Sequence, residues 1–204
     1  MGHKRGMPAY PNPSAFGCPQ REALPRMNIV LIGLRGCGKS AVGRELATRL
    51  GWRFVDTDAL VEERTGQTIR EIFADQAEAG FRELEAQVVS EVAHLTDHVI
   101  STGGGVVLRE DNVAALKGSG CLVWLTAPPE VLWERILGDL RRQQTRPALD
   151  LAAGLQQIRD TLKHREPIYT RVADVEVDTT GRSVSSIVER ILTRAHLRPP
   201  HTES

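Results

Sequence analysis

The chain has 204 residues, which is enough for one well-buried α/β domain. Lysine plus arginine total 26 and aspartate plus glutamate total 26, so the formal net charge is zero. Proteins that bind nucleic acids or anionic membranes usually carry a basic surplus, and no apolar run approaches the ~20 residues that span a bilayer. We therefore expect neither a nucleic acid nor a membrane as partner.

The first 26 residues are predicted to be a disordered extension. Five prolines interrupt them, and no apolar stretch marks a secretory signal. We expect one domain over residues 27–197 and a second disordered tail over 198–204. The three cysteines (Cys18, Cys37 and Cys121) are odd in number and form no CxxC pair, which favours a reducing cytoplasm over a disulfide framework.

The most informative segment is GLRGCGKS, residues 33–40, which matches the phosphate-binding pattern G-x-x-x-x-G-K-[ST]. It follows an apolar run predicted to be a buried strand and precedes a predicted helix. The glycines would turn backbone N–H groups onto phosphate oxygens, with Lys39 on the β- and γ-phosphates and the Ser40 hydroxyl on Mg²⁺. The simpler alternative is a glycine-rich turn with a surface lysine. The predicted nucleotide contacts in this segment are Gly36, Cys37, Gly38, Lys39, Ser40 and Ala41.

Cys37 lies among the predicted phosphate-binding amides, beside Lys39. This setting suggests a thiol that can be alkylated until a nucleotide covers it.

Asp56 and Asp58 end the second predicted strand, two residues apart, and share a face if the extended geometry persists. Asp58 could be the N-cap of a helix that starts near Ala59. Near a phosphate-binding loop, one carboxylate could instead organise Mg²⁺ through water while the other faces an acceptor hydroxyl. Both interpretations remain open from the residues alone.

Strands and helices alternate along the chain. We predict strands at 28–33, 53–56, 98–102, 121–126 and 173–177. The strongest helices are predicted at 39–50, 79–95, 129–137, 151–165 and 182–196. This alternation indicates a three-layer α/β/α fold, in which helices cover both faces of a five-stranded parallel sheet. Ligands of such sheets bind at the carboxyl ends of the strands.

A run of three glycines follows the third predicted strand, at residues 103–105. At the least it predicts a turn with several unusual φ values, and we favour a close approach of backbone N–H groups to a small ligand. Arg82 and Glu85 are three residues apart on a predicted helix, close enough to pair, although such pairs are usually solvated and contribute under ~1 kcal/mol.

Two further arginines precede prolines. Arg146 ends a polar stretch, residues 138–145, that is predicted to be a mobile loop. Arg165 is predicted to end a helix just before the next proline. Neither arginine is informative by itself.

Taken together, these segments resemble shikimate kinase, a family of small kinases of the nucleoside-monophosphate-kinase type. The resemblance covers residues 27 to about 195 and rests on GLRGCGKS, FVDTD, IFA followed by FRELE, STGGG, TRPAL and HREPIY, in this order. Many families share the phosphate-binding loop, whereas the DTD, FRxxE, GGG and RxPxY set is much more specific. Ala148 departs from the family pattern, since leucine usually follows this arginine-proline pair.

The resemblance implies that ATP, with Mg²⁺, phosphorylates the 3-hydroxyl of shikimate, a step of aromatic amino acid biosynthesis. Asp58 would bind this hydroxyl and act as base, while Ser40 and Asp56 would serve Mg²⁺. Arg82 and Arg165 would bind the substrate carboxylate, because a planar guanidinium suits a carboxylate better than an ammonium does.

Further roles follow from the same resemblance. Arg146 would swing in on a lid, about residues 138–150, and join Lys39 and Asp58 as a catalytic residue. Arg135 corresponds to an arginine that stacks on adenine, and Arg182 is expected near the same base. The residues expected to hold Arg82 or to shape the substrate site are Glu85, Phe73, Phe81, Gly103, Gly104 and Gly105.

Two rival functions remain. A kinase for another small polyol acid, such as gluconate, would share the loop and lid but has less need of the glycine run and the two arginines. A non-catalytic ATP-binding module would hold ATP without an acceptor, yet no extra effector domain is visible. Because small kinases of this architecture are often monomers, we expect a monomer here.

Overall fold

The computed structural model describes residues 27–142 and 151–195. They form an α/β fold around one parallel sheet with the strand order β2-β3-β1-β4-β5. The strands are β1 (Asn28–Ile32), β2 (Arg53–Asp56), β3 (His98–Ser101), β4 (Gly120–Thr126) and β5 (Val175–Asp178). The predicted fold class is confirmed, and each of the 5 strands begins and ends within 2 residues of its predicted bounds.

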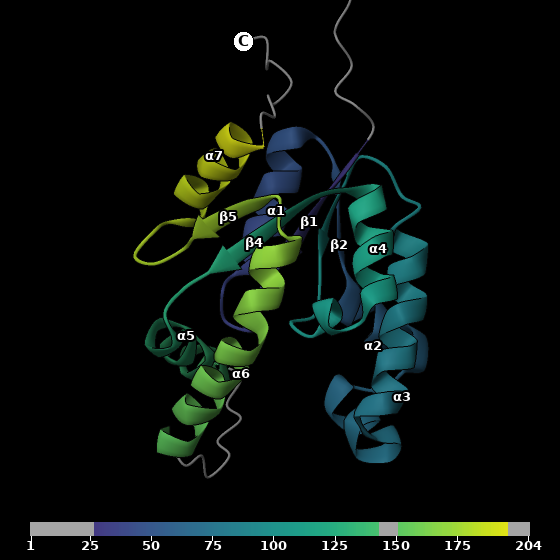
Figure 1. Cartoon of the computed structure of the whole chain (residues 1–204), viewed down its shortest axis with the longest axis vertical. Coiled ribbons are helices and arrows are strands. Elements are labelled where there is room, and N and C mark those ends of the chain that lie inside the picture. The colour runs from purple at the N-terminus through teal and green to yellow at the C-terminus, as the bar shows by residue number, and fades with distance from the viewer. Residues whose placement is uncertain (1–26, 143–150, 196–204) are drawn as a thin grey trace, which may run out of the picture.

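Helices cover both faces of this sheet (Figure 1). They are α1 (Lys39–Leu50), α2 (Thr57–Thr65), α3 (Ile69–Val92), the 3₁₀ turn η2 (Val106–Leu108), α4 (Glu110–Ser119), α5 (Pro129–Arg142), α6 (Leu151–Val172) and α7 (Val184–Arg194). Figure 1 shows α5 and α6 on one side of the carboxyl ends of the strands, with α2 and α3 on the other. The predicted tails and residues 143–150 of the predicted lid lie outside the described residues.

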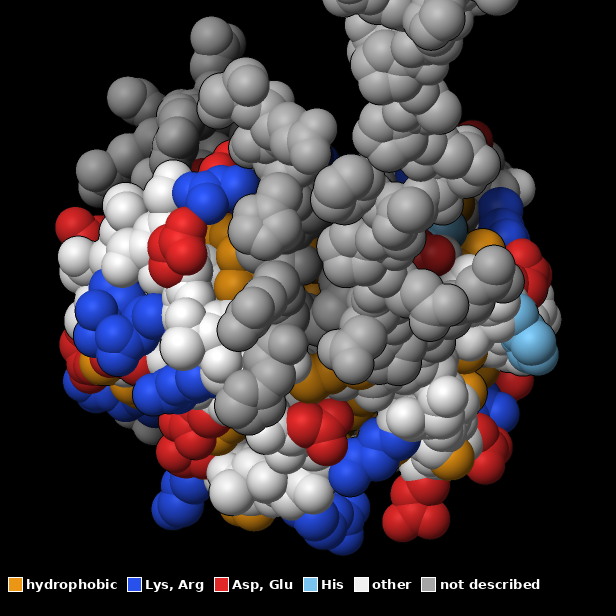
Figure 2. All heavy atoms as spheres, turned by 90° about the horizontal axis from the view of Figure 1, so that it is seen from above, with side chains coloured by type: hydrophobic (Ala, Val, Ile, Leu, Met, Phe, Trp, Pro, Cys, Tyr) orange, Lys and Arg blue, Asp and Glu red, His pale blue; other side chains and the backbone are white. Residues whose placement is uncertain are grey.

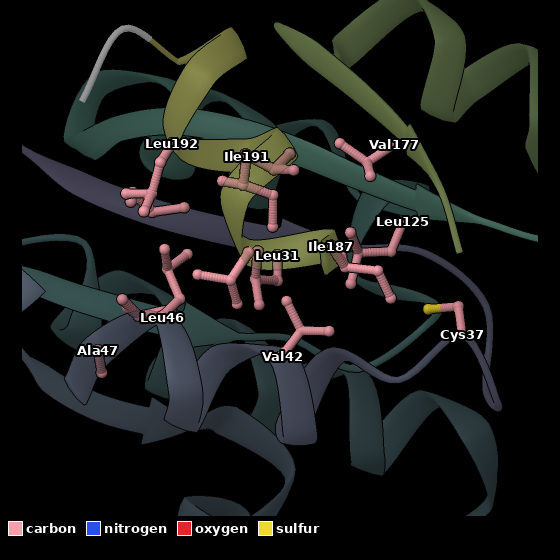
Figure 3. Packing of buried hydrophobic residues seen from close by; sticks show 14 of the residues in the cluster. Leu31, Cys37, Val42, Leu46, Ala47, Leu125, Val177, Ile187, Ile191 and Leu192 are labelled. Carbon is pink, nitrogen blue, oxygen red and sulfur yellow. The ribbon is translucent and has the colours of Figure 1, made fainter. Parts of the chain in front are cut away.

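Two apolar cores lie on opposite faces of the sheet, because side chains alternate along each strand. In β1, Ile29 and Leu31 enter the first core, whereas Val30 and Ile32 enter the second. The first core packs α1, α5, α7 and part of α6 against the sheet, and the second packs α2, α3, α4 and the end of α6. Figure 3 shows the first core, where side chains of α7 face those of α1 with Leu31 between them.

Two helices extend beyond their predicted ends. α6 continues through Pro167 to Val172, so the prediction that it ends at Arg165 is wrong. Pro167 removes one backbone N–H, but Tyr169 and Val172 beyond it are buried, and their packing maintains the last turns. The predicted mobile loop is also wrong in its first part, because residues 138–142 continue α5.

α3 is interrupted at Ala77, where φ is 56° and ψ is −173°. Side chains are almost never found in this backbone region, which costs an L-residue on the order of 1–3 kcal/mol. The interruption separates a first part, which begins with a capping box of Thr68 and Glu71, from a second part that carries Phe81, Arg82 and Glu85.

Replacing Ala77 by glycine is therefore expected to raise the free energy of unfolding by about 1 kcal/mol, because glycine adopts this backbone without a Cβ. Ala79→Gly is the matched control, since Ala79 is exposed and helical in the same α3. It should lower the free energy of unfolding by about 0.5–1 kcal/mol. Urea unfolding measures both changes, and equal destabilisation by the two variants would contradict the strain at Ala77.

Candidate active site

The phosphate-binding loop connects β1 to α1. Gly33, Gly36 and Gly38 have φ angles of 137°, 86° and 93°, which side chains rarely adopt. Nζ of Lys39 donates to the carbonyls of Gly33 at 2.8 Å and Leu34 at 3.1 Å, so the ammonium lies across the loop. Gly38 is the N-cap of α1 and provides no side-chain hydrogen bond. A glycine-capped helix start of this kind binds anions through its first N–H groups.

Asp56 links this loop to the next strand. Its Oδ2 accepts a hydrogen bond from Ser40 Oγ at 2.7 Å, and its Oδ1 accepts one from the backbone N–H of Asp58 at 3.1 Å. Asp56 is therefore the N-cap of α2, which begins at Thr57. The alternative in which Asp58 caps a helix starting near Ala59 is wrong, and the side chain of Asp58 lines the cleft described below.

Ser40 and Asp56 place two hard oxygen donors within 2.7 Å of each other beside the loop. Within residues 27–142 and 151–195, no group of three or more His, Cys, Asp and Glu side chains could hold a metal ion. Mg²⁺ is usually bound by one or two carboxylates together with substrate phosphates and waters, so this donor pair fits Mg²⁺ as part of a nucleotide complex.

The carboxyl group of Asp58 titrates above its ordinary range. Burial is the main cause that raises its pKa from 3.8 to about 6, and the negative charge of Asp56 acts in the same direction, while Lys39 opposes them. The group is mostly ionised at neutral pH, and its proton affinity suits a general base.

Arg82 and Glu85 form a buried ion pair rather than the usual solvated one. Nη1 of Arg82 donates to Oε2 of Glu85 at 2.7 Å, and the two side chains are 18% and 1% exposed. Nη2 and Nε of Arg82 donate to Glu78 at 2.8 and 3.2 Å. Burial raises the pKa of Glu85, and the charges of Arg82 and Arg165 oppose this rise. Glu85 therefore lies within the field of both arginines, and its buried Oε1 has no hydrogen-bond partner among the residues that the structure describes.

The three glycines after β3 make room for these charged side chains. A Cβ on Gly103 would lie 2.7 Å from Oδ1 of Asp58 and 2.8 Å from Oε1 of Glu85, and one on Gly105 would clash with the guanidinium of Arg82. None of the three glycines has a φ in the left-handed region, so the predicted run of unusual φ values is wrong. Glycine is needed here because carboxylate and guanidinium groups pack directly against the backbone.

Gly103→Ala is expected to lower kcat/KM roughly 10-fold, because the added methyl displaces Asp58 and Glu85 from their positions. Gly118→Ala in α4 is the control: a Cβ there meets nothing within 4 Å, so activity should stay at the parent value. Steady-state kinetics of both variants measure the difference. Parent-like kinetics of Gly103→Ala would show that the two carboxylates move aside without consequence.

Most of the predicted site residues line one cleft. Its volume of about 910 Å³ is typical of small-molecule sites. One wall belongs to α3 and the other to α5 and α6, on the two sides seen in Figure 1. The predicted residues that line the cleft are Gly36, Gly38, Lys39, Ser40, Ala41, Asp56, Asp58, Phe73, Phe81, Arg82, Glu85, Gly103, Gly104, Gly105, Arg135 and Arg165.

Two predicted nucleotide contacts do not line the cleft. Arg182 lies outside it, and its Nε donates to the carbonyl of Asp178 at 3.2 Å. The side chain of Cys37 is 1% exposed and belongs to the first core, where Figure 3 shows it beneath Leu125. The hypothesis of a readily alkylated thiol is therefore wrong. Arg146 lies outside the described residues.

Arg135 of α5 connects the loop after β5 to the phosphate-binding loop. Its Nη1 and Nη2 donate to the hydroxyl and carbonyl of Thr179 at 2.9 and 2.8 Å, and Nη1 also donates to the carbonyl of Gly36 at 3.4 Å. This arrangement holds the guanidinium at the edge of the cleft. Stacking of Arg135 on adenine stays a prediction.

Several residues of the cleft were not predicted from the sequence. The capping box of Thr68 and Glu71 could have located Ile69 at the start of α3. The motifs GLRGCGKS and STGGG contain four of the others, whereas Arg44, Asp139 and Gln157 carry no local signal. The cleft-lining residues that were not predicted are Leu34, Arg35, Arg44, Ile69, Ser101, Thr102, Asp139 and Gln157.

The outer surface carries charges of both signs. On the face shown in Figure 2, acidic and basic side chains are interspersed over the residues drawn in colour. Among the helices that the structure describes, none combines the length and apolar character needed to cross a bilayer. Positive charge converges instead in the cleft, where Lys39, Arg82, Arg135 and Arg165 lie.

A sequence profile described as shikimate kinase matches residues 35–196. Over 173 residues the chain is 46% identical to a shikimate kinase of Symbiobacterium thermophilum, a match that covers 84% of this chain and 98% of that protein. The chain belongs to the shikimate kinase family. The predicted family is thereby confirmed, and the chain is a P-loop kinase.

Solved structures agree with this membership. The shikimate kinase of Acinetobacter baumannii in complex with shikimate has a TM-score of 0.75 and 37% identity, over 83% of this chain and 92% of that one. A gluconokinase from Sinorhizobium meliloti has a TM-score of 0.60 and 23% identity, over 84% of this chain and 92% of that one. The second likeness shows the fold alone.

Proposed function

We propose that this chain transfers the γ-phosphoryl group of ATP to the 3-hydroxyl of shikimate. The observation that carries the proposal is the composition of the cleft, where Lys39 of the phosphate-binding loop faces Asp58 and two arginines. A triphosphate donor requires a phosphate-binding loop with its lysine. An acceptor that carries both a hydroxyl and a carboxylate requires a base for the hydroxyl and arginines for the carboxylate. The relative from Acinetobacter baumannii, which was solved with shikimate, supports the choice of acceptor.

On the donor side, the amides of the loop and the ammonium of Lys39 would bind the β- and γ-phosphates. Ser40 and Asp56 would hold Mg²⁺. When bound, this ion neutralises charge on the phosphate oxygens. Arg146 of the predicted lid would neutralise charge near the transferring phosphoryl group, and this role stays a prediction.

On the acceptor side, the carboxylate of Asp58 would orient the 3-hydroxyl and accept its proton as the new oxygen–phosphorus bond forms. Arg82 and Arg165 would bind the substrate carboxylate, with Glu78 and Glu85 fixing the plane of the Arg82 guanidinium. Phe73 and Phe81, whose ring centroids are 4.9 Å apart, would cover the apolar side of the substrate and exclude water.

Arg165→Lys is expected to raise the KM for shikimate about 10-fold with little change in the KM for ATP, because one ammonium cannot replace a bidentate guanidinium. Arg171→Lys is the control, since Arg171 is exposed on the same helix and does not line the cleft. Initial-rate kinetics with each substrate varied separately measure both constants. An unchanged KM for shikimate would show that its carboxylate is bound elsewhere.

One experiment separates the proposal from its rivals. ADP release is followed with ATP and Mg²⁺ in three reactions that contain shikimate, gluconate or no acceptor. Of the three reactions, we expect only the one with shikimate to release ADP quickly. This release should be lost when EDTA removes Mg²⁺. Faster release with gluconate would favour the other polyol acid kinase, and ATP binding without ADP release in any reaction would favour the non-catalytic module.

We also propose a monomer that works in the cytoplasm. Small kinases of this architecture are often monomers, which supports the first part of this proposal. Cys37 and Cys121, the cysteines within the described residues, are free thiols, as is usual in a reducing compartment. Light scattering of the active enzyme tests the monomer, and a dimer mass at assay concentrations would exclude it.

A further inference from the structure

Tyr169 of α6 connects the acceptor side of the cleft to the sheet. Its side chain is fully buried, and its ring stacks on Trp124 of β4 with centroids 5.6 Å apart and planes at 21°. Its Oη donates a hydrogen bond to the carbonyl of Gly104 at 2.5 Å. Burial raises the pKa of this hydroxyl above its ordinary range, so the group stays protonated and remains a donor. The stacked ring therefore fixes the position of the Gly104 carbonyl.

Arg165 lies one helical turn before Tyr169 on α6. The positive charge of its guanidinium opposes the rise of the Tyr169 pKa that burial causes. Nη1 of Arg165 would also lie 3.6 Å from a Cβ placed on Gly104. The guanidinium of Arg165 therefore lies beside Gly104, whose carbonyl accepts the hydrogen bond from Tyr169.

Gly104 packs against the phosphate-binding loop as well. A Cβ on Gly104 would lie 3.4 Å from the carbonyl oxygen of Gly33 and 3.6 Å from the backbone nitrogen of Arg35. Gly104 is consequently held between the loop that binds the donor and the helix that carries Arg165. The hydroxyl of Tyr169 links these two parts of the site.

We propose that Tyr169 is a positioning residue for the acceptor: its hydroxyl sets the distance between Arg165 and the phosphate-binding loop and so places the carboxylate of the substrate. This inference rests on the proposed function, in which Arg165 binds that carboxylate. Tyr169 acts through Arg165 and Gly104 and does not touch the reacting atoms.

The test is Tyr169→Phe, which keeps the stacked ring and removes one oxygen. The KM for shikimate is expected to rise on the order of tenfold, while the KM for ATP and kcat with saturating shikimate stay within about twofold. The decisive readout is a second acceptor, an analogue of shikimate in which a hydroxymethyl group replaces the carboxylate. Parent and Tyr169→Phe should use this analogue with kcat/KM values within about twofold of each other, because no carboxylate is left to misplace. Equal losses with both acceptors would reveal a merely structural role and overturn the proposal.

Two controls sharpen this comparison. Val172→Ala shortens a buried side chain of the same helix and the same core as Tyr169, so it lowers stability and should leave both KM values unchanged. A tenfold rise of the KM for shikimate in Val172→Ala would count against a specific role of the hydroxyl. In an Arg165→Lys background, Tyr169→Phe should add less than about twofold to the KM for shikimate, whereas a full additional tenfold would show that the two residues act independently.

A measurement on the unaltered protein keeps the proposal testable if Tyr169→Phe does not fold. The chain has only 2 tyrosines, Tyr10 and Tyr169, so protein labelled with ¹³C at tyrosine Cζ gives two signals. Shikimate should shift one signal and the hydroxymethyl analogue should leave it in place, with the other signal as internal reference. Equal shifts with both acceptors, or none with shikimate, would contradict the proposal. Failure of the proposed function would be seen separately, as a parent enzyme that does not release ADP with shikimate.

Discussion

Lys39→Ala is expected to lower kcat by at least ~10²-fold, the usual scale for losing a preorganised charge at a site where negative charge develops. The Nζ of Lys39 lies across the phosphate-binding loop, held by the carbonyls of Gly33 and Leu34 at 2.8 and 3.1 Å. Without the ammonium group, the γ-phosphate would lose its positively charged partner, and the two carbonyls would lose their hydrogen-bond donor. Steady-state ADP release with saturating ATP and shikimate measures the loss.

Two further variants separate charge from shape. Lys39→Met keeps most of the side-chain volume and should lose as much activity as Lys39→Ala if the ammonium is what matters. Lys117→Ala removes an exposed lysine of α4 that does not line the cleft and should retain parent activity. A Lys39→Ala enzyme with near-parent kcat would remove this lysine from the mechanism.

Asp58→Asn is expected to have two opposite effects. The first is a loss of kcat of at least ~10²-fold, because an amide orients the acceptor hydroxyl but cannot take its proton. The parent enzyme should also lose kcat/KM as the pH falls below about 6, the pKa to which burial raises Asp58. A pH–rate profile checks this, and the residual activity of Asp58→Asn should lack the acid limb.

The second effect is a gain of stability. Because the folded-state pKa of Asp58 is raised from 3.8 to about 6, ionisation of this group opposes folding. The penalty is absent below about pH 3.8, grows as the pH rises, and is fully present above about pH 6. At pH 7.5, Asp58→Asn should therefore unfold with a free energy about 1–3 kcal/mol above the parent, and the difference should vanish toward pH 4.

Asp111→Asn is the matched control for both effects. Asp111 lies in α4, and its side chain is 87% exposed with only a 3.8 Å contact to Arg109. Its replacement should leave kcat unchanged and the free energy of unfolding within about 0.5 kcal/mol of the parent. An Asp58→Asn protein that is no more stable than the parent at pH 7.5 would contradict the burial of an ionised carboxylate in the cleft.

Features with a local cause could be predicted from the sequence. The apolar runs of the strands and the glycine-lysine pattern after β1 each depend on a few neighbouring residues, so the sheet and the phosphate-binding loop appear where they were predicted. The cap of α2 could not be assigned in this way. Asp56 and Asp58 are both good N-caps in sequence, and the backbone φ and ψ of Asp56, with its bond from Asp58 N–H, decide between them.

Features with a distant cause escaped prediction. The glycines at 103–105 suggested an unusual turn, but the reason for them lies in Asp58, Arg82 and Glu85, which belong to α2 and α3. α6 passes the proline that should have ended it, because its last turns are buried against the sheet. Tyr169 looked like part of a family motif and no more, since its partner Gly104 is 65 positions away.

The two separate cores bear on how such an enzyme can change its substrate. The helix that follows the phosphate-binding loop rests on one side of the sheet, while α2 and α3, which are expected to contact the acceptor, rest on the other. Substitutions in α2 and α3 therefore disturb the packing of a different core from the one that supports the helix after the phosphate-binding loop. An ancestral chain of this architecture could therefore change its acceptor alcohol while its nucleotide-binding loop stayed as it was.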